Sequence, residues 1–515
     1  MAHKTFEEIE FGDFQTPRIL ARQVCELLKD LEVAPTSIIE PNCGQGNLLF
    51  EALDIFPNVK QAIGLDVSSL YITAVKSQLR SHPDEGKVTL IEEDFFKTNW
   101  PEIIRDLCEP ILIIGNPPWV TNAQVTVLNG LNVPVKSNFQ SHSGLDAKMG
   151  KSNFDISEWM LIQFLGLLNN RTAKMAMLCK TAVARKLLRH AYKNNISLSH
   201  SSIYRIDAAK HFGAMVDACL FICHFERGIC QYDCSVYETI HASAPERVIG
   251  YRDEVLVSKV SLYEKWKHLK GNEIYKWRSG IKHDCSKIME LTKEGERYRN
   301  GLGHLADIED TFLYPMLKTS EVAKPVANPT RYMIVTQQTV GGDTSTIKEV
   351  APMTWAYLET HSDLFDKRGS VIYKNRPRFS VFGIGDYSFS PWKVAISGFY
   401  KRFQFKVIGP VEGKSVVLDD SSYFVPCYSE EEAVLVGILL NSVPAKEFFD
   451  SLTFWDSKRP ITIDLLRKID LLKVARELNL DMELQKVLDA KLKEPKRTRT
   501  RKALPQSENL ELLLI

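Results

Sequence analysis

At 515 residues the chain is too long for one ordinary hydrophobic core, so we expect two large domains. Its 65 lysines and arginines nearly balance 64 aspartates and glutamates, and the net charge of +1 excludes an overall positive field as the basis of nucleic-acid binding. The longest apolar runs, such as 160–168, fall short of the roughly 20 residues that span a bilayer, which excludes a membrane protein. Ten scattered cysteines and the lack of an N-terminal leader predict a reduced, cytoplasmic protein.

The first functional pattern is a glycine-rich turn between a strand and a helix. After a helix predicted over 18–31, the apolar strand 37–40 runs into Gly44-Gln45-Gly46 and a second helix. Glycines let a backbone approach a ligand closely, and the following helix presents its N-terminus to that ligand. We predict a cofactor loop here, with a plain strand-to-helix turn as the alternative.

The next two predicted strands end in acidic residues. Strand 61–66 ends at Asp66, at a distance from the glycine turn that suits a carboxylate holding a ribose diol, although Asp66 could also cap the helix over 68–79. Strand 88–91 leads into Asp94 and Phe95, where a carboxylate could accept from an adenine amino group while an aromatic ring covers the base.

A fourth strand, 111–115, meets Asn116-Pro117-Pro118-Trp119. The two prolines stop the strand and fix a rigid turn at its carboxyl end, where open α/β sheets place their sites. Asn116 offers an amide donor and a carbonyl acceptor, the Pro117 carbonyl offers a second acceptor, and Trp119 offers an aromatic face. The combination suits a planar ligand that carries an amino group.

Together these patterns resemble the N6-adenine DNA methyltransferases, which use S-adenosylmethionine. Residues 11–17 match the N-terminal cofactor motif of that family, residues 40–46 look like its acid-Pro-x-x-Gly-x-Gly loop, and residues 116–119 are similar to its catalytic Asn-Pro-Pro-aromatic motif. The motif order resembles the gamma class, in which target recognition follows catalysis. The chain departs from the family at Glu40, Leu48 and Trp119, and Lys180 stands where proline is expected.

The resemblance implies an α/β fold: a Rossmann-like methyltransferase sheet with helices on both faces, followed by a C-terminal α+β target-recognition domain. It also implies a set of S-adenosylmethionine-binding residues. These are Phe11, Thr16, Pro17, Glu40, Pro41, Asn42, Gly44, Gly46, Asp66, Asp94, Phe95 and Asn116.

The implied reaction is methyl transfer to N6 of an adenine flipped out of the duplex. Asn116, Pro117 and Trp119 would be catalytic, and the base would be held between Trp119 and Phe212, for which an ordinary buried phenylalanine is the alternative. The open alternatives for the whole chain are an RNA or protein-glutamine methyltransferase and an inactive DNA-recognition subunit.

Four cysteines cluster at 219, 223, 230 and 234. Their spacing favours a hairpin of two buried strands with small apolar side chains on one face over a metal site, so no metal is expected.

The expected domains are a catalytic domain over 1–245, a helical linker over 246–300, a target-recognition domain over 301–490 and a basic tail over 491–515. We expect a monomer that binds double-stranded DNA, in a restriction-modification or related phage-defence system that could include a separate restriction endonuclease. Loop cations and cations interleaved with aromatics are the candidate DNA contacts. They are Lys136, Lys148 and Lys151 in the loop 121–151, and Lys318, Lys374, Arg376, Arg378, Lys393, Lys401 and Arg402 further on. The alternatives are a loop that is disordered without a partner and ordinary surface charge beside core aromatics.

Overall fold

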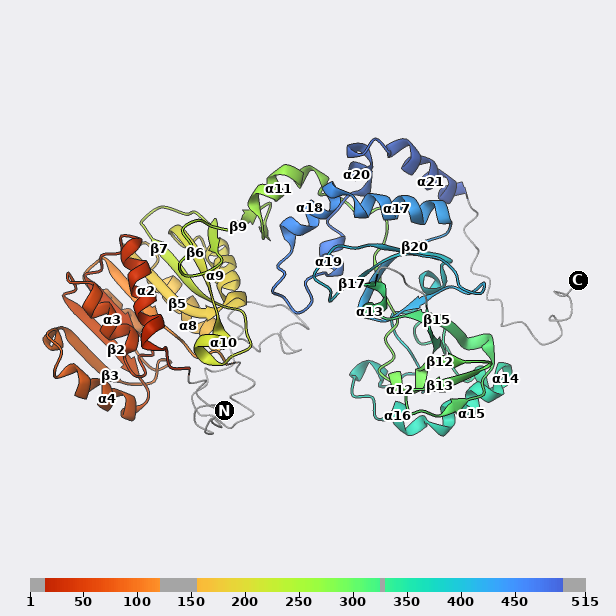
Figure 1. Cartoon of the computed structure of the whole chain (residues 1–515), viewed down its shortest axis with the longest axis horizontal. Helices are drawn as coiled ribbons and strands as arrows, with labels where there is room; N and C mark the ends of the chain where they lie inside the picture. The colour runs from red at the N-terminus through yellow and green to blue at the C-terminus, as the bar shows by residue number, and fades with distance from the viewer. Residues whose placement is uncertain (1–13, 121–154, 325–328, 494–515) are drawn as a thin grey trace, which may run out of the picture. The chain divides into compact units, whose positions relative to one another are not determined.

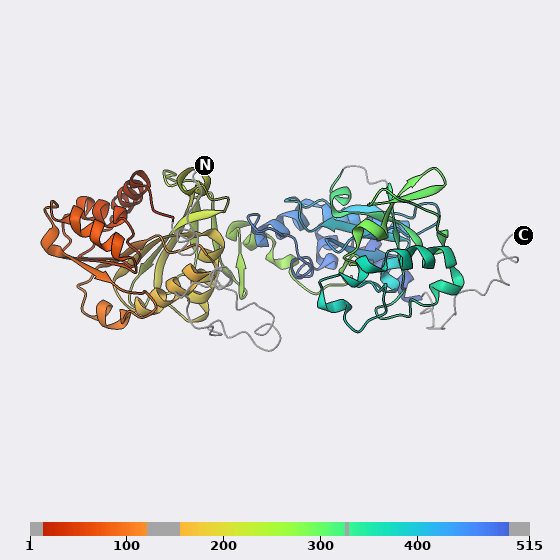
Figure 2. The ribbon, with the colours of Figure 1, turned by 90° about the horizontal axis from the view of Figure 1, so that it is seen from below.

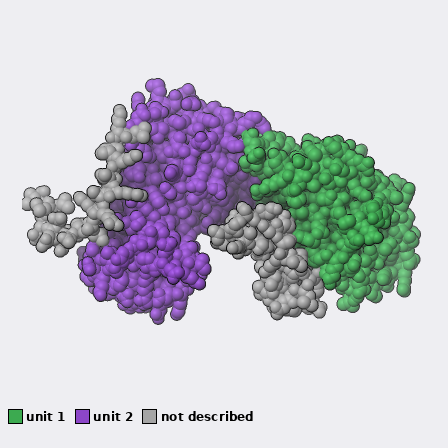
Figure 3. Space-filling model, turned by 180° about the vertical axis from the view of Figure 1, so that it is seen from behind, with its two compact units in different colours: residues 1–260 green, residues 261–515 purple. Residues whose placement is uncertain are grey.

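The computed structural model describes residues 14–120, 155–324 and 329–493. It forms two compact units, 1–260 and 261–515, which Figure 3 shows in green and purple. Several predicted site residues lie outside the described residues. They are Phe11, Lys136, Lys148, Lys151 and the tail from 494 onward.

The first unit is built on a ten-stranded sheet with the order β10-β9-β8-β6-β7-β5-β4-β1-β2-β3 (Figures 1 and 2). Strands β3, β2, β1, β4 and β5 are parallel neighbours, whereas β7 runs antiparallel to both β5 and β6. The strands are β1 (Ser37–Glu40), β2 (Gln61–Asp66), β3 (Val88–Glu92), β4 (Ile111–Gly115), β5 (Ala173–Lys180), β6 (Leu198–Ile206), β7 (Ala218–Phe225), β8 (Cys234–Tyr237), β9 (Arg247–Arg252) and β10 (Val255–Val257). The helices are α2 (Arg18–Asp30), α3 (Asn47–Ile55), α4 (Ser69–Leu79), α5 (Trp100–Arg105), α8 (Ile156–Leu167), α9 (Thr181–Lys193) and α10 (Ala208–Phe212).

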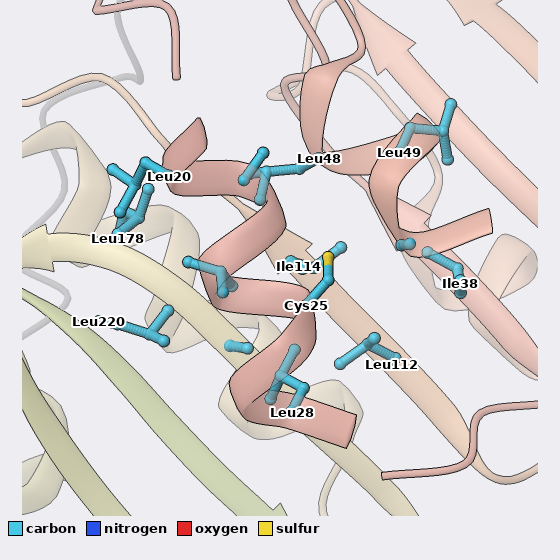
Figure 4. Packing of buried hydrophobic residues seen from close by; sticks show 14 of the residues in the cluster. Leu20, Cys25, Leu28, Ile38, Leu48, Leu49, Leu112, Ile114, Leu178 and Leu220 are labelled. Carbon is cyan, nitrogen blue, oxygen red and sulfur yellow. The ribbon is translucent and has the colours of Figure 1, made fainter. Parts of the chain in front are cut away.

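Helices cover both faces of this sheet. On one face, α2 and α3 bury Leu20, Leu28 and Leu48 against alternate residues of the central strands, including Leu112 and Ile114 (Figure 4). The intervening residues of β4 are also fully buried, so the sheet requires a second layer of cover. Helix α9 packs on the neighbouring strands β5, β6 and β7, and α8 packs on α9. The expected doubly wound α/β sheet is therefore confirmed.

Two expectations for the end of this unit are wrong. The cysteine-bearing strands β7 and β8 do not form a hairpin, because β6 lies between them and pairs with both. Residues 246–300 do not form a helical linker, because β9 and β10 extend the first sheet, and strands of the second unit begin before residue 300. In short strands with many charges, such as those in 290–300, polar and apolar residues alternate too little for the sequence pattern to distinguish a strand from an exposed helix.

The second unit is α+β, as expected, with a six-stranded sheet of order β14-β13-β12-β16-β15-β19 and a four-stranded sheet of order β11-β20-β17-β18. The strands are β11 (Arg278–Ser279), β12 (Glu290–Glu294), β13 (Arg297–Asn300), β14 (Leu305–Ala306), β15 (Leu313–Leu317), β16 (Arg331–Ile334), β17 (Trp392–Ser397), β18 (Lys406–Ile408), β19 (Val417–Leu418) and β20 (Ser422–Cys427). The helices are α11 (Val260–Trp266), α12 (Ser286–Met289), α13 (Thr319–Val322), α14 (Ile347–Val350), α15 (Pro352–Thr360), α16 (Ser362–Asp366), α17 (Glu430–Asn441), α18 (Val443–Leu452), α19 (Ile463–Leu466), α20 (Leu471–Glu477) and α21 (Asp481–Lys493). Throughout the described ranges, every helix is too short or too polar to cross a bilayer.

Candidate functional site

The glycine turn is held open by an acid from the neighbouring strand. Asp66, at the end of β2, accepts from the backbone N–H of Gly44 at 2.8 Å and from that of Ser68 at 2.9 Å. Gly44 and Gly46 have φ values of +48° and +76°, a region that side chains disfavour. The predicted loop and the predicted acid are thus part of one structure, and Asp66 shapes the loop through backbone contacts.

Three consecutive residues before α2 join this loop to the end of β4. The Phe14 carbonyl accepts from Asn116 Nδ2 at 2.8 Å, Gln15 Oε1 accepts from the Gln45 N–H at 2.9 Å, and the Thr16 carbonyl accepts from Asn47 Nδ2 at 2.8 Å. A Cβ on Gly44 would lie 2.3 Å from Gln15 Oε1, so the glycine is required for this close approach. The strand ends that carry the motifs therefore form one connected site.

Two asparagine side chains in this site have buried oxygens that lack a donor among the described residues: Asn42 Oδ1 in the glycine turn and Asn116 Oδ1 at the end of β4. Leaving such an acceptor without a donor costs about 1–3 kcal/mol. The bond from Asn116 Nδ2 to Phe14 fixes which atom of that amide is the acceptor. Both oxygens therefore suit donors from a bound molecule.

The aromatic residues of the site are in contact with one another. Trp119 is 5% exposed, its Nε1 donates to the Leu178 carbonyl at 3.3 Å, and its ring lies 5.0 Å from that of Phe212 at 72°. Phe14 completes the cluster, 5.6 Å from Trp119 and 6.2 Å from Phe212. A base stacked on both faces needs parallel rings about 7 Å apart, so the expected gap between Trp119 and Phe212 is absent from this conformation.

Lys180 links the turn at 116–119 to the start of α8. Its Nζ donates to the Trp119 carbonyl at 2.8 Å and to Asp155 Oδ2 at 2.6 Å. Asp155 is 7% exposed in its side chain and also accepts from the Ser157 N–H, as N-cap of α8. The backbone of Ile156 donates to the Val120 carbonyl at 2.9 Å. The unexpected lysine thus fixes the backbone that follows the two prolines.

The structure corrects the prediction for Phe95. Its ring is 4% exposed and lies 5.0 Å from Trp100 and 5.5 Å from Phe164, because the chain turns inward after β3. Phe96 is the more open of the pair and contacts Trp159 at 5.1 Å. Asp94 accepts from the Phe96 N–H at 2.9 Å and thereby holds this turn.

Glu40 supports the loop from the buried end of β1. It is 3% exposed and accepts from the Leu49 N–H in the first turn of α3 at 2.9 Å. Burial raises the pKa of Glu40 well above its usual value, and the hydrogen bond from Leu49 acts against that shift. A carboxyl group in these surroundings stabilises the turn rather than supplying a charge to a ligand.

Comparison with known proteins decides the family. The Type II methyltransferase M.NspV of a Nostoc species is 46% identical to the chain over 471 residues, which are 91% of the chain and 98% of that relative. The chain belongs to the Type II methyltransferase family. The Type II methyltransferase M.CvrRI of a Paramecium bursaria Chlorella virus is 30% identical over 115 residues, 22% of this methyltransferase and 26% of the viral one. No family model matches.

Two solved structures show weaker similarity. The Type IIL restriction-modification enzyme MmeI in complex with DNA aligns with 95% of this methyltransferase and 74% of its own chain, at 14% identity and a TM-score of 0.47. A methyltransferase subunit of a type I restriction-modification system from Streptococcus thermophilus aligns with 44% and 48%, at 14% identity and a TM-score of 0.29. The family assignment rests on the sequence relative.

The predicted cations in the second unit of the methyltransferase have unequal surroundings. Lys393 is only 1% exposed, its Nζ donates to the Ser390 carbonyl at 2.7 Å, and burial lowers its pKa to about 7, so its predicted DNA contact is wrong. Arg378 forms ion pairs with Asp366 and Glu359, and Arg402 donates to the Ala323 carbonyl.

The other predicted cations can reach a partner. Lys374, Arg376 and Lys401 are exposed, and Lys318 is half-buried in an ion pair with Glu290 at 2.6 Å.

The cysteines at 219, 223 and 234 are buried, whereas Cys230 is exposed. Within the described residues no group of three or more metal-ligating side chains comes together.

Sequence reasoning missed Phe14, Gln15 and Lys180. The first two lie inside the N-terminal motif, whose spacing could have suggested contacts with the glycine turn. Lys180 carried a weaker signal, since only the absence of the expected proline singled it out.

Proposed function

We propose that this Type II methyltransferase transfers a methyl group to N6 of adenine in duplex DNA, as a gamma-class enzyme. The observation that carries the proposal is the buried oxygen of Asn116, which has no donor among the described residues and whose amide is oriented by the Phe14 carbonyl. An exocyclic amino group offers the two hydrogens that this oxygen and the adjacent Pro117 carbonyl can accept.

S-adenosylmethionine, the cofactor, supplies the electrophilic methyl group. The residues present fit it: a glycine turn that a Cβ would fill, a helix N-terminus behind that turn, and the donor-free Asn42 oxygen, which suits the cofactor's ammonium group. Asp66 keeps the turn in this shape through the Gly44 N–H.

The chain's own residues make N6 nucleophilic. By accepting both N6 hydrogens, Asn116 and Pro117 draw the nitrogen out of conjugation and direct its lone pair at the methyl carbon. With S-adenosylmethionine bound, a carbon–nitrogen bond would form as the cofactor's carbon–sulfur bond breaks, and the nitrogen would then lose one proton to solvent. The base must leave the duplex to reach Asn116, and the contact between Trp119 and Phe212 must open if both rings are to stack on it.

The second unit would supply target recognition, and the enzyme would protect DNA within a restriction-modification system, as the Type II relatives suggest. We expect it to act as a monomer on DNA, with any restriction endonuclease a separate protein. An RNA or protein-glutamine substrate is the competing function, because amide and amino groups share this hydrogen-bonding pattern.

The test is transfer of a radiolabelled methyl group to unmethylated bacterial genomic DNA, with the products digested to nucleosides. Wild-type protein should label N6-methyladenine, and Asn116→Ala should lower the rate roughly 100- to 1,000-fold because it removes an acceptor aimed at the reacting nitrogen. Asn194→Ala is the matched control, since its side-chain amide donates to the His190 carbonyl at the end of α9.

The same assay separates the alternatives. Label in cytosine would overturn the adenine assignment. Label in RNA or in a glutamine peptide, but not in DNA, would overturn the substrate. A wild-type protein that labels nothing would indicate an inactive recognition subunit.

A further inference from the structure

A cavity with four cations in its lining lies on the face of the six-stranded sheet that points away from the core of the second unit. Its lining includes residues of α12, β12 and β13, which Figure 1 labels. It has a volume of about 180 Å³. Its lining is polar and charged, and consists of Ser286, Lys287, Glu290, Thr292, Arg299, Asn300, Gly301, Lys318 and Arg331.

The floor of this cavity is set by strand register. Thr292 of β12 lies directly opposite Arg299 on β13 and Arg331 on β16. Directly paired residues project from the same face of a sheet, so the two arginines flank the threonine. The opposite face carries Leu291 and Tyr332, which are buried in the core. The outer face therefore presents a row of two guanidinium groups with a hydroxyl between them.

Carboxylates hold three of the four cations in place. Arg299 pairs with both oxygens of Glu294 at 2.7 and 2.8 Å, Lys318 pairs with Glu290 at 2.6 Å, and Arg331 Nε lies 3.7 Å from Glu321. Each cation keeps further N–H donors after these contacts. The fourth cation, Lys287, is exposed and has no partner for its ammonium group in the described part of the chain.

Glu290 is the one acid in the lining, and it is committed to the protein. Burial acts to raise its pKa, but hydrogen bonds from His283 and Lys318 outweigh burial and hold the pKa below its usual value. Its charge therefore orients Lys318 and is not available to repel an anion as an exposed acid would be.

The size and lining define the ligand class. Sites for whole small molecules usually measure 300–1,000 Å³, so 180 Å³ suits a small group. The lining has no aromatic side chain on which a base could stack. Guanidinium and ammonium donors around one hydroxyl match the oxygens of a phosphate.

We propose that this cavity binds a backbone phosphate of DNA and so anchors the second unit on the duplex. This deepens the proposed function and rests on it. The site supplies affinity and register rather than base recognition. In a chain with a net charge of only +1, such a local site takes the place of an overall positive field.

The experiment measures binding of the full-length protein to a fluorescein-labelled, mixed-sequence DNA duplex over a series of KCl concentrations, without methyl donor. Lys287→Gln and Arg331→Gln should each lower the affinity for DNA several-fold at low salt. Each should also make the negative slope of log K against log[KCl] shallower by up to about 0.9, the value for one phosphate that the protein no longer neutralises. Arg331→Lys should retain most of the slope. Lys348→Gln, on exposed α14, is the matched control and should leave it unchanged.

If both glutamine variants still bound DNA with the same dependence of log K on log[KCl] as the wild type, the proposal would be overturned. A second result would also overturn it. If inorganic phosphate or ATP raised the Tm of the wild type but not of the variants, while the salt dependence of DNA binding stayed the same in all of them, the ligand would be a free phosphate compound. Binding is read without methyl transfer. A wild type that binds DNA but does not methylate it would thus refute the proposed function alone.

Discussion

Replacing Lys180 with methionine removes the ammonium group that joins the Trp119 carbonyl to Asp155 while keeping most of the side-chain volume. Asp155 is 7% exposed, so the change leaves a buried carboxylate without its cation. Breaking a fully buried pair costs about 3–5 kcal/mol, and Lys180 is 24% exposed, so we expect about 2 kcal/mol. For a unit of this size that lowers Tm by about 4–8 °C.

The effect on activity should be larger than stability alone explains. The Trp119 carbonyl follows the two prolines directly, so its release lets the Asn116 turn shift, and misplacement by about 1 Å can cost 100-fold in rate. We expect kcat to fall roughly 10- to 100-fold with little change in KM for S-adenosylmethionine.

Lys186→Met is the matched control. Lys186 pairs with Glu158 at 2.5 Å, and that acid is fully buried on the same helix that Asp155 caps. This pair joins α8 to α9, and Lys186 is 51% exposed, so its removal should lower Tm by less than the loss of Lys180 and leave kcat within about three-fold of wild type. Equal reductions of kcat in the two variants, or full activity in Lys180→Met, would refute the positioning role, and Lys180→Arg should restore part of the activity.

Two further variants test the loop and the buried lysine. Gly44→Ala should weaken S-adenosylmethionine binding measured by calorimetry, because the new Cβ would meet Gln15 and the φ of this residue is +48°. Gly213→Ala is the control: its φ is +65° but the space around it is open, so it should cost only about 1 kcal/mol of backbone strain and leave the cofactor affinity intact. Because the pKa of Lys393 falls from 10.5 to about 7 on folding, the unfolded chain binds more protons between these values, so the free energy of unfolding should rise with pH across that window. Lys393→Met should flatten this rise, measured by urea titrations at several pH values, and stabilise the protein near pH 7 by on the order of 3 kcal/mol. An unchanged dependence on pH would contradict the lowered pKa of Lys393.

The sequence predicted the glycine loop, the acid at the end of β2 and the Asn-Pro-Pro-Trp turn because each is local. Glycines between a strand and a helix, or two prolines after an apolar strand, restrict the backbone whatever surrounds them. Parallel strands also bring their carboxyl ends to one edge, so Gly44, Asp66 and Asn116 could be placed together without knowing any side-chain contact.

Burial of individual side chains could not be read in the same way. Phe95 and Lys393 looked like a ring and a cation available to ligands, but the chain turns Phe95 inward and β20 lies against Lys393 in β17. Strand pairing likewise set Arg299, across the short β12–β13 hairpin, and Arg331, from the more distant strand β16, beside Thr292. Such neighbours depend on register, which short polar strands specify weakly in sequence.

The predicted catalytic motif, Asn116-Pro117-Pro118-Trp119, shows the division most clearly. The sequence by itself determined that a strand ends there in a rigid turn carrying an amide and two carbonyls. Only the tertiary structure decided that Phe14 leaves the Asn116 oxygen as the acceptor, that Trp119 packs against Phe212, and that Lys180 fixes the turn. The physical reason is that backbone restriction acts within a few residues, whereas these contacts join segments 61 to 102 residues apart.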